Sequence, residues 1–466
     1  MKLKLILTII IINIFAFKAH SLEPDKFDLR DYQRVTAPKF QNMPGPCWAF
    51  ASLSACESNY LTQKFNFINN INLSAMHLAY LAHENFTPFD KSGGVLGAQG
   101  NAFISTAILS SLNGPVSEHD APYSMQALNN FNNLKFKNIL RVTDVLGLSL
   151  SQEPSDNNIK KYLIKTHGAI LASFYSDFNK YKAINNFYTY FNNSHGKLTT
   201  HDVILIGWDD NFSRDNFLPR PKHNGAWLAQ NSWGSGWGVT NSCNKQNHNA
   251  YANSRQTRGI LKSNASNKQN YNSHESGGYF WISYEQYLRG GYAFITSKPD
   301  KLLKHYGHDN LGWCKNLKFN YAANIFQVQT RREILQDIAF YTTRDNANYE
   351  IYIYDLNFNE PSDPVTNGKL LYKSQGKIKF SGYHTIKLNL QDLNQIILKQ
   401  NQYFSVIIKL DCPQACECKI KNYSDKFKIN KHESYFSNYL NKNWLDGADL
   451  REPANACIKA FTKTLF

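Results

Sequence analysis

Beyond its first twenty-one residues the chain has no apolar run of about 18 residues, the length that a transmembrane helix needs. It also has no internal repeat and no nucleic-acid-binding motif. The cysteine-rich stretch "CPQACEC" (412–418) has no second C-x-x-C pair to complete a zinc-type ligand set. These absences argue against a repeat array, a specific nucleic-acid partner and a structural metal.

The N-terminus has the features of a secretory signal. Lys2 and Lys4 precede an apolar run from 5 to 17, and Ala19-His20-Ser21 offers small residues at both positions that a signal peptidase reads. The apolar run is too short to span a bilayer as a mature anchor. We therefore predict a signal peptide over 1–21 and a secreted or periplasmic mature chain without a transmembrane segment; an uncleaved anchor is the alternative.

The chain is basic, with a formal net charge of +15 that falls to +12 when the three lysines of the signal are removed. Such a charge favours anionic surfaces such as lipopolysaccharide or acidic glycans. The lysines are scattered among Asn and Ser residues and form no dense block. We expect non-specific attraction to an anionic cell surface and no specific nucleic acid.

Export permits disulfides, and several of the eight cysteines are available for them. We expect the 412–418 trio to bridge to Cys314 or Cys457, although spacing alone does not define the pairs. Neither a metal nor another cofactor is expected. The cysteines are Cys47, Cys56, Cys243, Cys314, Cys412, Cys416, Cys418 and Cys457.

Residues 22–287 mix helical and strand patterns, which predicts an α+β domain. Helical spacing marks 47–61 and 101–112. Short apolar runs at 201–210 and 225–234 predict buried strands.

Within this domain, residues 239–276 are rich in Asn, Ser, Gln and Lys and nearly free of an apolar pattern. Such a segment cannot bury enough surface to offset its ordering entropy. We predict a mobile polar insertion that follows the site and could cover it.

Residues 288–466 form a second domain with an all-β pattern. Alternating or apolar segments separated by turn residues, with no strongly helical segment among them, predict a β-sandwich. The expected strands are 333–343, 349–356, 376–390 and 402–410.

The stretch "FQNMPGPCWAFAS" (40–52) places Cys47 at the mouth of the first helix. A thiol attacks as its thiolate, and a helix N-terminus and a nearby imidazolium both lower its pKa. His201 heads a buried strand, and Asn231 on the next strand could orient it. Gln41 and the Cys47 backbone N–H are candidate oxyanion donors. A small buried core residue is the alternative for Cys47 alone.

Together, "Q-x5-C-W-A-F", the histidine at a strand start and "NSWGSGWG" resemble the papain-like cysteine peptidases over about residues 25–287. The resemblance implies a two-lobed fold, with a helical lobe and a β-rich lobe. It implies that Cys47 is the nucleophile, His201 the general base and acid, Asn231 the residue orienting His201, and Gln41 the oxyanion-hole donor.

The same resemblance suggests further positions. Trp233 matches an indole that shields the His–Asn hydrogen bond and borders the substrate site. Gly93 and Gly94 match positions where the substrate backbone pairs. Glu57, ten residues after Cys47, matches another family position.

The chain also departs from the family pattern. Residues 44–46 read Pro-Gly-Pro where Cys-Gly-Ser is usual, so a common disulfide is missing. Asp202 stands where a small apolar residue is usual, and strand alternation should turn it away from His201. Little sequence separates the predicted signal from "FDLRD" (27–31), so we expect no inhibitory propeptide.

The second domain resembles the lectin-like domain that follows papain-like peptidases in some secreted microbial proteins. The likeness rests on 306–313, 322–343 and 349–356, and it implies a carbohydrate partner. Aromatic side chains could stack on sugar rings or pack in the core or between the domains; the candidates are Tyr306, Trp313 and Trp444.

From these observations we predict a secreted cysteine endopeptidase that cleaves protein or peptide substrates through an acyl-enzyme. Two alternatives remain: a catalytically silent binding protein that uses its lectin-like domain, and an acyltransferase that passes the acyl group to an amine.

Overall fold

A computed structural model describes residues 23–42, 45–86, 100–124, 137–151, 156–194, 196–238, 277–358, 361–388, 395–418 and 428–465. Several predicted features lie outside these residues: the signal peptide (1–21), Gly93, Gly94 and the insertion (239–276). Among the described residues, no helix combines the length and apolar character that crossing a membrane requires.

The first part of the chain mixes helices with strands, as the α+β prediction requires. Its helices are α2 (Cys47–Thr62), α3 (Ala75–Phe86), α4 (Ala102–Ser110) and α6 (Asn157–His167). Its strands are β1 (Lys26–Asp28), β2 (Arg141–Leu146), β3 (Ile170–Phe174), β4 (Tyr181–Ile184), β5 (Phe187–Tyr190), β6 (His201–Asp209), β7 (Ala226–Gln230), β8 (Tyr279–Ser283) and β9 (Arg289–Ser297).

The described remainder of the chain is built from strands. These are β10 (Leu303–Gly307), β11 (Lys315–Leu317), β12 (Tyr321–Gln327), β13 (Arg332–Thr342), β14 (Ala347–Asn357), β15 (Lys369–Ile378), β16 (Gly382–Lys387), β17 (Ile397–Lys399), β18 (Tyr403–Leu410), β19 (Gln414–Cys418), β20 (Ser434–Ser437), β21 (Leu445–Asp446), β22 (Ala454–Ala456) and β23 (Ile458–Thr464). The expected strand 376–390 is divided: its first residues end β15 and its centre forms β16.

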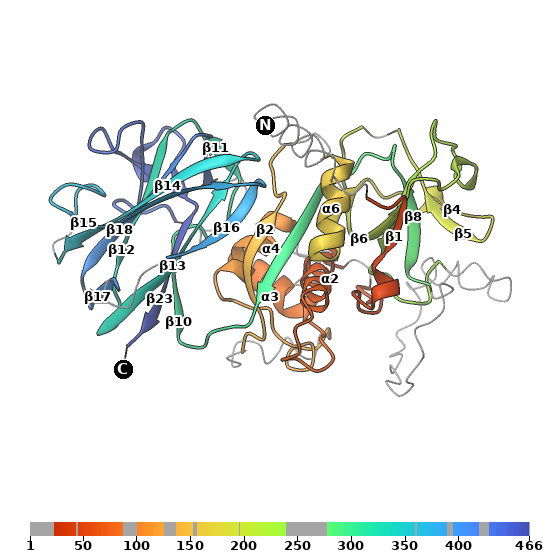
Figure 1. Cartoon of the computed structure of the whole chain (residues 1–466), viewed down its shortest axis with the longest axis horizontal. Coiled ribbons are helices and arrows are strands. Elements are labelled where there is room, and N and C mark those ends of the chain that lie inside the picture. Colours follow the sequence, from red (N-terminus) through yellow and green to blue (C-terminus); the bar gives the residue numbers. More distant parts are fainter. Residues whose placement is uncertain are drawn as a thin grey trace, which may run out of the picture.

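Helix α2 is the centre of the first part. Every residue from Trp48 to Tyr60 is buried, so the helix is enclosed on all sides, and it packs on β6, β9, α3 and α4. Figure 1 shows the helices in the middle of the molecule, with β4, β5 and β8 on one side and the strands of the second part on the other.

The second part is a sandwich of two sheets. The six-stranded sheet β15-β14-β18-β12-β20-β21 covers a face that includes β13 and β23. Side chains such as Ile338 and Ala460 from one sheet share a buried cluster with Ile353 and Val406 from the other.

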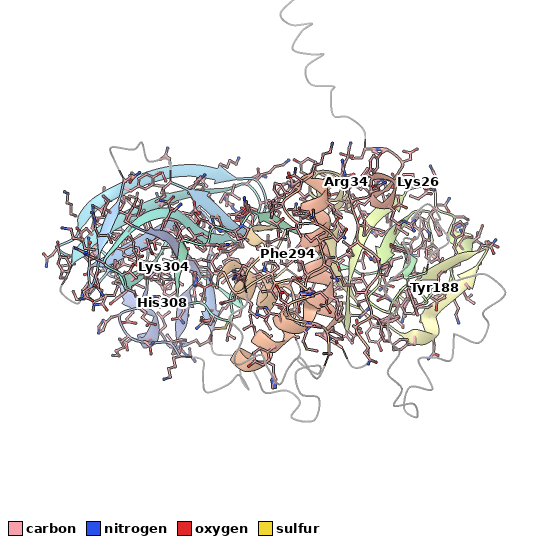
Figure 2. The ribbon with its side chains drawn as sticks, turned by 90° about the horizontal axis from the view of Figure 1, so that it is seen from below. Lys26, Arg34, Tyr188, Phe294, Lys304 and His308 are labelled. Atoms are coloured by element: carbon pink, nitrogen blue, oxygen red, sulfur yellow. A yellow bond between two sulfur atoms is a disulfide. The ribbon has the colours of Figure 1, made fainter. Side chains whose placement is uncertain are left out.

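One ladder of strands joins the two parts, which the sequence did not predict. Gly382 and Tyr383 of β16 pair with Leu146 and Val145 of β2, and β2 pairs with β9. The resulting fourteen-stranded sheet runs from β10 to β4. Phe294 on β9 lies at the middle of the molecule (Figure 2).

Trp313 packs at this junction. Its indole contacts Phe103 of α4 edge-on at a centroid distance of 5.6 Å and lies beside Tyr341 of β13. Trp313 and Tyr306 are both buried, and the Tyr306 hydroxyl donates to the Glu333 carboxylate. Neither ring is free to stack on a sugar. The half-buried Trp444 donates its indole N–H to the Leu440 carbonyl.

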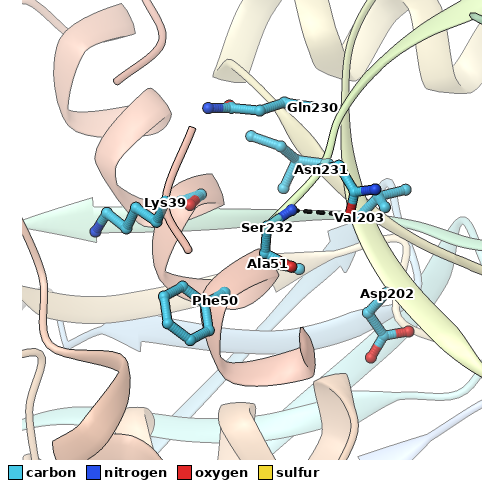
Figure 3. A pocket seen from close by; sticks show the side chains of 10 residues that line it. Lys39, Phe50, Ala51, Asp202, Val203, Gln230, Asn231 and Ser232 are labelled. Atoms are coloured by element: carbon cyan, nitrogen blue, oxygen red, sulfur yellow. Dashed lines mark hydrogen bonds between the residues drawn. The ribbon is translucent and has the colours of Figure 1, made fainter. Parts of the chain in front are cut away.

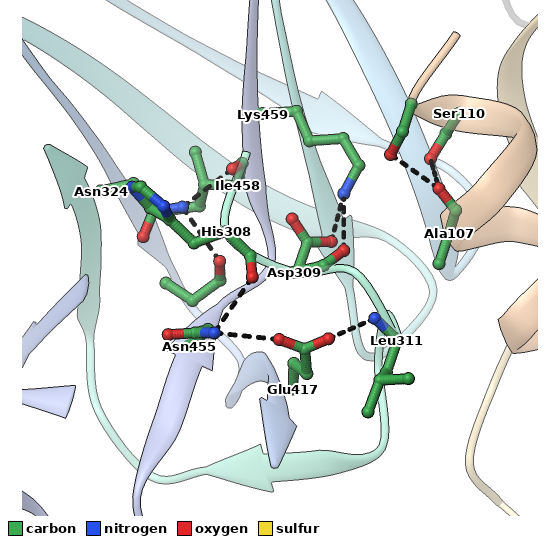
Figure 4. Close-up of polar contacts among 12 residues, drawn as sticks. Ala107, Ser110, His308, Asp309, Leu311, Asn324, Glu417, Asn455, Ile458 and Lys459 are labelled. Carbon is green, nitrogen blue, oxygen red and sulfur yellow. Dashed lines mark hydrogen bonds and ion pairs between the residues drawn. The ribbon is translucent and has the colours of Figure 1, made fainter. Parts of the chain in front are cut away.

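Charged groups are buried inside the second part (Figure 4). Lys459 forms an ion pair with Asp309, and both side chains are almost completely buried. Glu417 accepts hydrogen bonds from the Leu311 N–H and from the Asn455 side-chain amide. A disulfide joins Cys314 and Cys418, which confirms the expected bridge from the 412–418 trio to Cys314.

Candidate active site

The predicted nucleophile and base lie where a helix meets a sheet. Cys47 is the first residue of α2, after the N-cap Pro46, and His201 is the first residue of β6. The side chain of Asp202, next to His201, is close enough for its charge to act on the Cys47 thiol. Packing of α2 on β6 therefore brings residues 154 positions apart in the sequence to one place.

The predicted orienting residue contacts the predicted base. His201 Nε2 lies 2.8 Å from Asn231 Oδ1, and both residues are buried. Asn231 follows β7 directly, and β7 pairs with β6. Because Nε2 is held by Asn231, Nδ1 is the ring nitrogen left to exchange a proton with a reacting group.

Trp233 covers this pair. Its indole stacks on the His201 imidazole, with centroids 4.9 Å apart and planes 25° apart. The half-exposed Phe178, on the short 3₁₀ turn Phe178–Lys180, stacks on the same indole at 5.0 Å. The sequence did not indicate Phe178, because a lone aromatic residue in a turn has no motif around it.

Gln41 lies beside Asn231 and is held through Ser232. The Gln41 backbone N–H donates to the Ser232 carbonyl oxygen (2.8 Å), and the Ser232 hydroxyl donates to Gln41 Oε1 (2.5 Å). The Ser232 N–H donates to Asn231 Oδ1 at 2.8 Å. Ser232 was not predicted, although its position inside "QNSWG" was a signal that could have found it.

Both predicted oxyanion donors meet at one oxygen atom. The Cys47 N–H donates to the Gly45 carbonyl oxygen at 2.9 Å, and Gln41 Nε2 donates to the same oxygen at 3.3 Å. Two N–H groups that converge on one carbonyl oxygen have the arrangement that stabilises an oxyanion. In this structure the Gly45 carbonyl fills the position.

The segment before Gln41 is anchored to α2 by Glu57. This fully buried carboxylate accepts from Lys39 Nζ (2.5 Å), from the Thr36 hydroxyl (2.5 Å) and from the Leu73 N–H (2.6 Å). Glu57, which matches a family position in the sequence, therefore joins two elements: it connects the segment that carries Gln41 to the helix that begins with Cys47.

The ionisation of the site differs from the prediction. Burial, together with the charge of the nearby Asp202, raises the pKa of the Cys47 thiol to about 12. Burial lowers the pKa of His201 to about 4, against the opposing effect of the Asn231 hydrogen bond. Burial of the site therefore opposes the lowering expected from the helix N-terminus, although the Cys47 side chain itself is only half-buried.

Asp202 itself is buried, and burial raises its pKa to about 6, opposed by the Ser173 hydroxyl and by Arg289. It lines a crevice of about 10 Å³ between α2, β6 and β7, together with Phe50, Asn231 and Ser232 (Figure 3). The crevice is too small for a substrate side chain and marks the packed seam beneath the site. Within the described ranges no three His, Cys, Asp or Glu side chains are grouped so as to hold a metal ion.

Comparison with known proteins defines the class. Residues 23–267 match the papain family of cysteine proteases, and residues 305–462 match the lectin-like domain. Since the first match covers more than half of the chain, the chain belongs to the papain family of cysteine proteases.

Curated relatives match the first part. A cysteine protease of Blomia tropicalis is 27% identical over 224 residues, which cover 46% of this chain and 59% of that protein. Falcipain-2a of Plasmodium falciparum is 28% identical over 214 residues, covering 46% and 39%. The chain spans about half the length of the curated relatives it matches.

Two solved structures share the whole fold. The cysteine protease and lectin-like domains of Cwp84, a surface layer associated protein of Clostridium difficile, superpose with a TM-score of 0.71 at 24% identity, covering 95% of this chain and 90% of that one. Cwp84 after propeptide cleavage gives 0.71 at 23% identity, covering 94% and 99%. The papain-like fold followed by a β-rich lectin-like domain is therefore the fold of this chain.

Proposed function

We propose that this protein is an exported cysteine endopeptidase that hydrolyses peptide bonds in proteins or peptides. The observation that carries the proposal is the 2.8 Å hydrogen bond between His201 and Asn231, beside a thiol held at the start of α2. Membership of the papain family supports the same reaction class.

In the proposed reaction the Cys47 sulfur attacks the substrate carbonyl carbon while its proton moves to His201 Nδ1. The tetrahedral oxyanion accepts hydrogen bonds from Gln41 Nε2 and the Cys47 N–H, after the Gly45 carbonyl has moved aside. His201 then gives its proton to the leaving amine, and the C–N bond breaks to leave a thioester. Water, deprotonated by His201, releases the acid and restores the thiol.

The pKa values suggest when the proton moves. With the thiol pKa raised and the imidazole pKa lowered, both groups favour their neutral forms in this arrangement. We propose that proton transfer accompanies substrate binding, when the Gly45 carbonyl leaves its two donors and the surroundings of the sulfur change.

The proposal is tested with a peptide library and an epoxide inhibitor. The wild-type protein should cleave library peptides internally and be labelled at Cys47, and Cys47→Ala should lose both properties. A protein that is neither labelled nor active would support the silent binding protein instead. Transfer of the acyl group to an added amine in preference to water would support the acyltransferase.

For the organisation of the chain, we propose that the catalytic domain extends through β9. The boundary expected after residue 287 falls between β8 and β9. However, β9 pairs with β3, which also pairs with β6, so β9 belongs to the same sheet as the strand that carries His201. The proposal thus places the end of the catalytic domain at residue 297 and assigns the strands from β10 onward to the lectin-like domain.

We also propose that the lectin-like domain takes a carbohydrate. A cavity of about 480 Å³ lies in this domain, lined by side chains that include the half-buried rings of Tyr403 and His308 and the polar groups of Gln327, His432 and Glu433. Rings for stacking beside amide and carboxylate groups suit a saccharide. A glycan array, repeated with Tyr403→Ala, tests this; unchanged or absent glycan binding would contradict it.

Export is proposed from the predicted signal peptide over 1–21. The Cwp84 structures lend support, since Cwp84 is described as surface layer associated. Signal removal is checked by N-terminal sequencing of the protein recovered outside the cytoplasm.

A further inference from the structure

A cavity of about 410 Å³ lies on the six-stranded sheet of the lectin-like domain. Its lining residues come from β14, β15 and β18, which lie side by side in that sheet (Figure 1), and from Asp411 directly after β18. Strand β18 runs from Tyr403, which lines the cavity proposed above for a carbohydrate, to Leu410, which lines this one. The two cavities are therefore at opposite ends of one strand.

The two carboxylates that line this cavity are held by donors of the protein itself. Glu350 accepts from Lys409 Nζ and from the Tyr352 hydroxyl, both at 2.5 Å. Asp411 accepts from the Asn348 backbone N–H at 3.0 Å and from Asn348 Nδ2 at 2.6 Å. Each carboxylate oxygen thus has a donor within the protein.

Ion pairs at the edge of the cavity add positive charge. Lys373 Nζ lies 3.6 Å from the Glu350 carboxylate, and Arg344 Nη2 lies 2.9 Å from the Asp411 carboxylate. The side chains of Lys373 and Arg344 are 51% and 54% exposed, so a ligand can reach them. An ammonium group has three N–H donors and a guanidinium group five, so one ion pair leaves each side chain with further donors.

Strand β15 brings another cation and an amide to the same face. Lys377 is directly opposite Asn348 in the pairing of β14 with β15, and Gln375 is opposite Glu350. Opposed residues of antiparallel strands lie on the same side of a sheet, and the side chains of Lys377 and Gln375 are exposed. With Lys409 included, four cations surround two carboxylates, which leaves an excess of two positive charges.

We propose that this cavity binds an acidic saccharide. The remaining N–H donors and the excess of positive charge favour a carboxylate or phosphate group. The Gln375 amide can both donate to and accept from the hydroxyl groups of a sugar ring, and the volume of the cavity is in the range of small-ligand sites. The choice of a saccharide rests on the carbohydrate-binding function proposed for the domain, whereas the choice of an acid rests on the charges alone.

Isothermal titration calorimetry of the whole protein tests the proposal. Trigalacturonate supplies carboxylates, mannose 6-phosphate supplies a phosphate, and the fully methylated ester of trigalacturonate is the uncharged comparison. At least one of the two acids should bind, and the ester should not.

Variants locate the binding. Lys377→Gln should raise the Kd of the bound acid about 10-fold, because a hydrogen bond between charged groups is lost, and Lys373→Gln should do the same. Lys399→Gln is the matched control, since this exposed lysine is on β17 in the other sheet, and its Kd should equal that of the wild type. Tyr403→Ala, in the first cavity, should also leave acid binding unchanged.

Three results would overturn the proposal. The first is that neither acid binds. The second is that Lys399→Gln weakens binding as much as Lys377→Gln, which would show a diffuse attraction to a basic protein. The third is that polyglutamate binds at the same lysines as tightly as trigalacturonate, which would exclude a saccharide-specific site.

Failure of this site and failure of the carbohydrate function proposed above are distinguishable. Acid binding that disappears in Tyr403→Ala would place the acid in the first cavity and overturn the second site alone. A protein that binds the acids through Lys377 and no neutral glycan would overturn the first cavity as a carbohydrate site and support this one.

Discussion

The imidazole of His201 stacks on the indole of Trp233, with ring centroids 4.9 Å apart and planes inclined by 25°. Trp233 is buried, and it also stacks on Phe178, whose side chain is 50% exposed. The only ring in this stack with a large solvent-accessible surface is therefore Phe178, and the His201–Asn231 hydrogen bond is kept from water by Trp233.

This arrangement predicts the effect of Trp233→Ala. Removing the indole admits water to His201, and because burial is what lowers the pKa of His201 to about 4, that pKa should rise towards its ordinary value. Without the stacked indole the His201 imidazole can also change its orientation, so kcat/KM should fall by about 10-fold. Histidine NMR titration and the kinetics of peptide cleavage measure the two effects.

Phe178→Ala is the matched comparison, because its ring contacts Trp233 from a half-exposed position. We expect a smaller rise in the pKa of His201 and a smaller kinetic loss. Equal effects from the two variants would contradict the shielding role of Trp233.

Asp202→Asn should lower the pKa of the Cys47 thiol. After burial, the negative charge of Asp202 is the next cause of the raised thiol pKa, and the amide removes that charge at nearly constant shape. The rate of alkylation by iodoacetamide is measured over a series of pH values, with Cys47→Ala as the blank. As pH increases, the rate should begin to rise at a lower pH in the variant than in the wild type.

The sign of this effect follows from the titration of Asp202. Its pKa is raised to about 6, so the carboxyl is neutral in more acid solution and charged at neutral pH. The variant and the wild type should therefore differ most above pH 6 and converge below it. A difference that grows towards acid pH would contradict this account.

Gly45→Ala should disturb both proposed oxyanion donors. A Cβ at this position would overlap the Gln41 carbonyl oxygen and lie 2.8 Å from the Asn42 carbonyl oxygen, so the loop has to shift. If Gln41 Nε2 and Cys47 N are the oxyanion donors, as proposed, kcat should fall by roughly 10-fold or more, since both depend on this loop. Steady-state kinetics on a cleaved peptide measure the loss.

Gly236→Ala provides the control, because a Cβ there would meet no heavy atom within 4 Å. Its kcat should remain at the wild-type value. If Gly45→Ala were equally silent, the loop would not be positioning the donors.

The sequence was sufficient to locate the candidate site because its signals are local. The Pro-Gly-Pro bend and the spacing of apolar residues predicted that Cys47 begins a helix, and α2 begins there. The apolar run at 201–210 predicted a buried strand, and β6 begins at His201 and ends at Asp209.

What the sequence could not predict depends on contacts between distant segments. The thiol pKa follows from how closely α2 packs on β6 and from the position of Asp202, and no periodicity encodes either. The pairing of β2 with β16 joins residues more than two hundred positions apart. Likewise, Tyr306 has an aromatic side chain of the type that stacks on sugars, and only the fold shows that this side chain is buried.

Glu417 predicts a pH dependence of stability in the lectin-like domain. Burial, reinforced by the charge of Asp309, raises its pKa to about 8, whereas an unfolded glutamate titrates near 4.5. Between these values the folded state binds more protons than the unfolded state, so the free energy of unfolding falls as pH rises from 4.5 to 8. At about 1.4 kcal/mol per pKa unit, the full difference between the two pKa values corresponds to about 5 kcal/mol.

Glu417→Gln removes this titration while its side-chain oxygen can still accept from the Asn455 amide. The melting temperature of the variant should therefore fall less than that of the wild type between pH 5 and pH 8, as measured by differential scanning calorimetry. Glu452→Gln is the control: this exposed carboxylate pairs with Lys315, which lowers its pKa, so its substitution should leave the slope between pH 5 and pH 8 unchanged. If the melting temperatures of Glu417→Gln and wild type fell equally across that range, the Glu417 carboxyl would be charged throughout. Lys459 would then have to balance two carboxylates, those of Asp309 and Glu417.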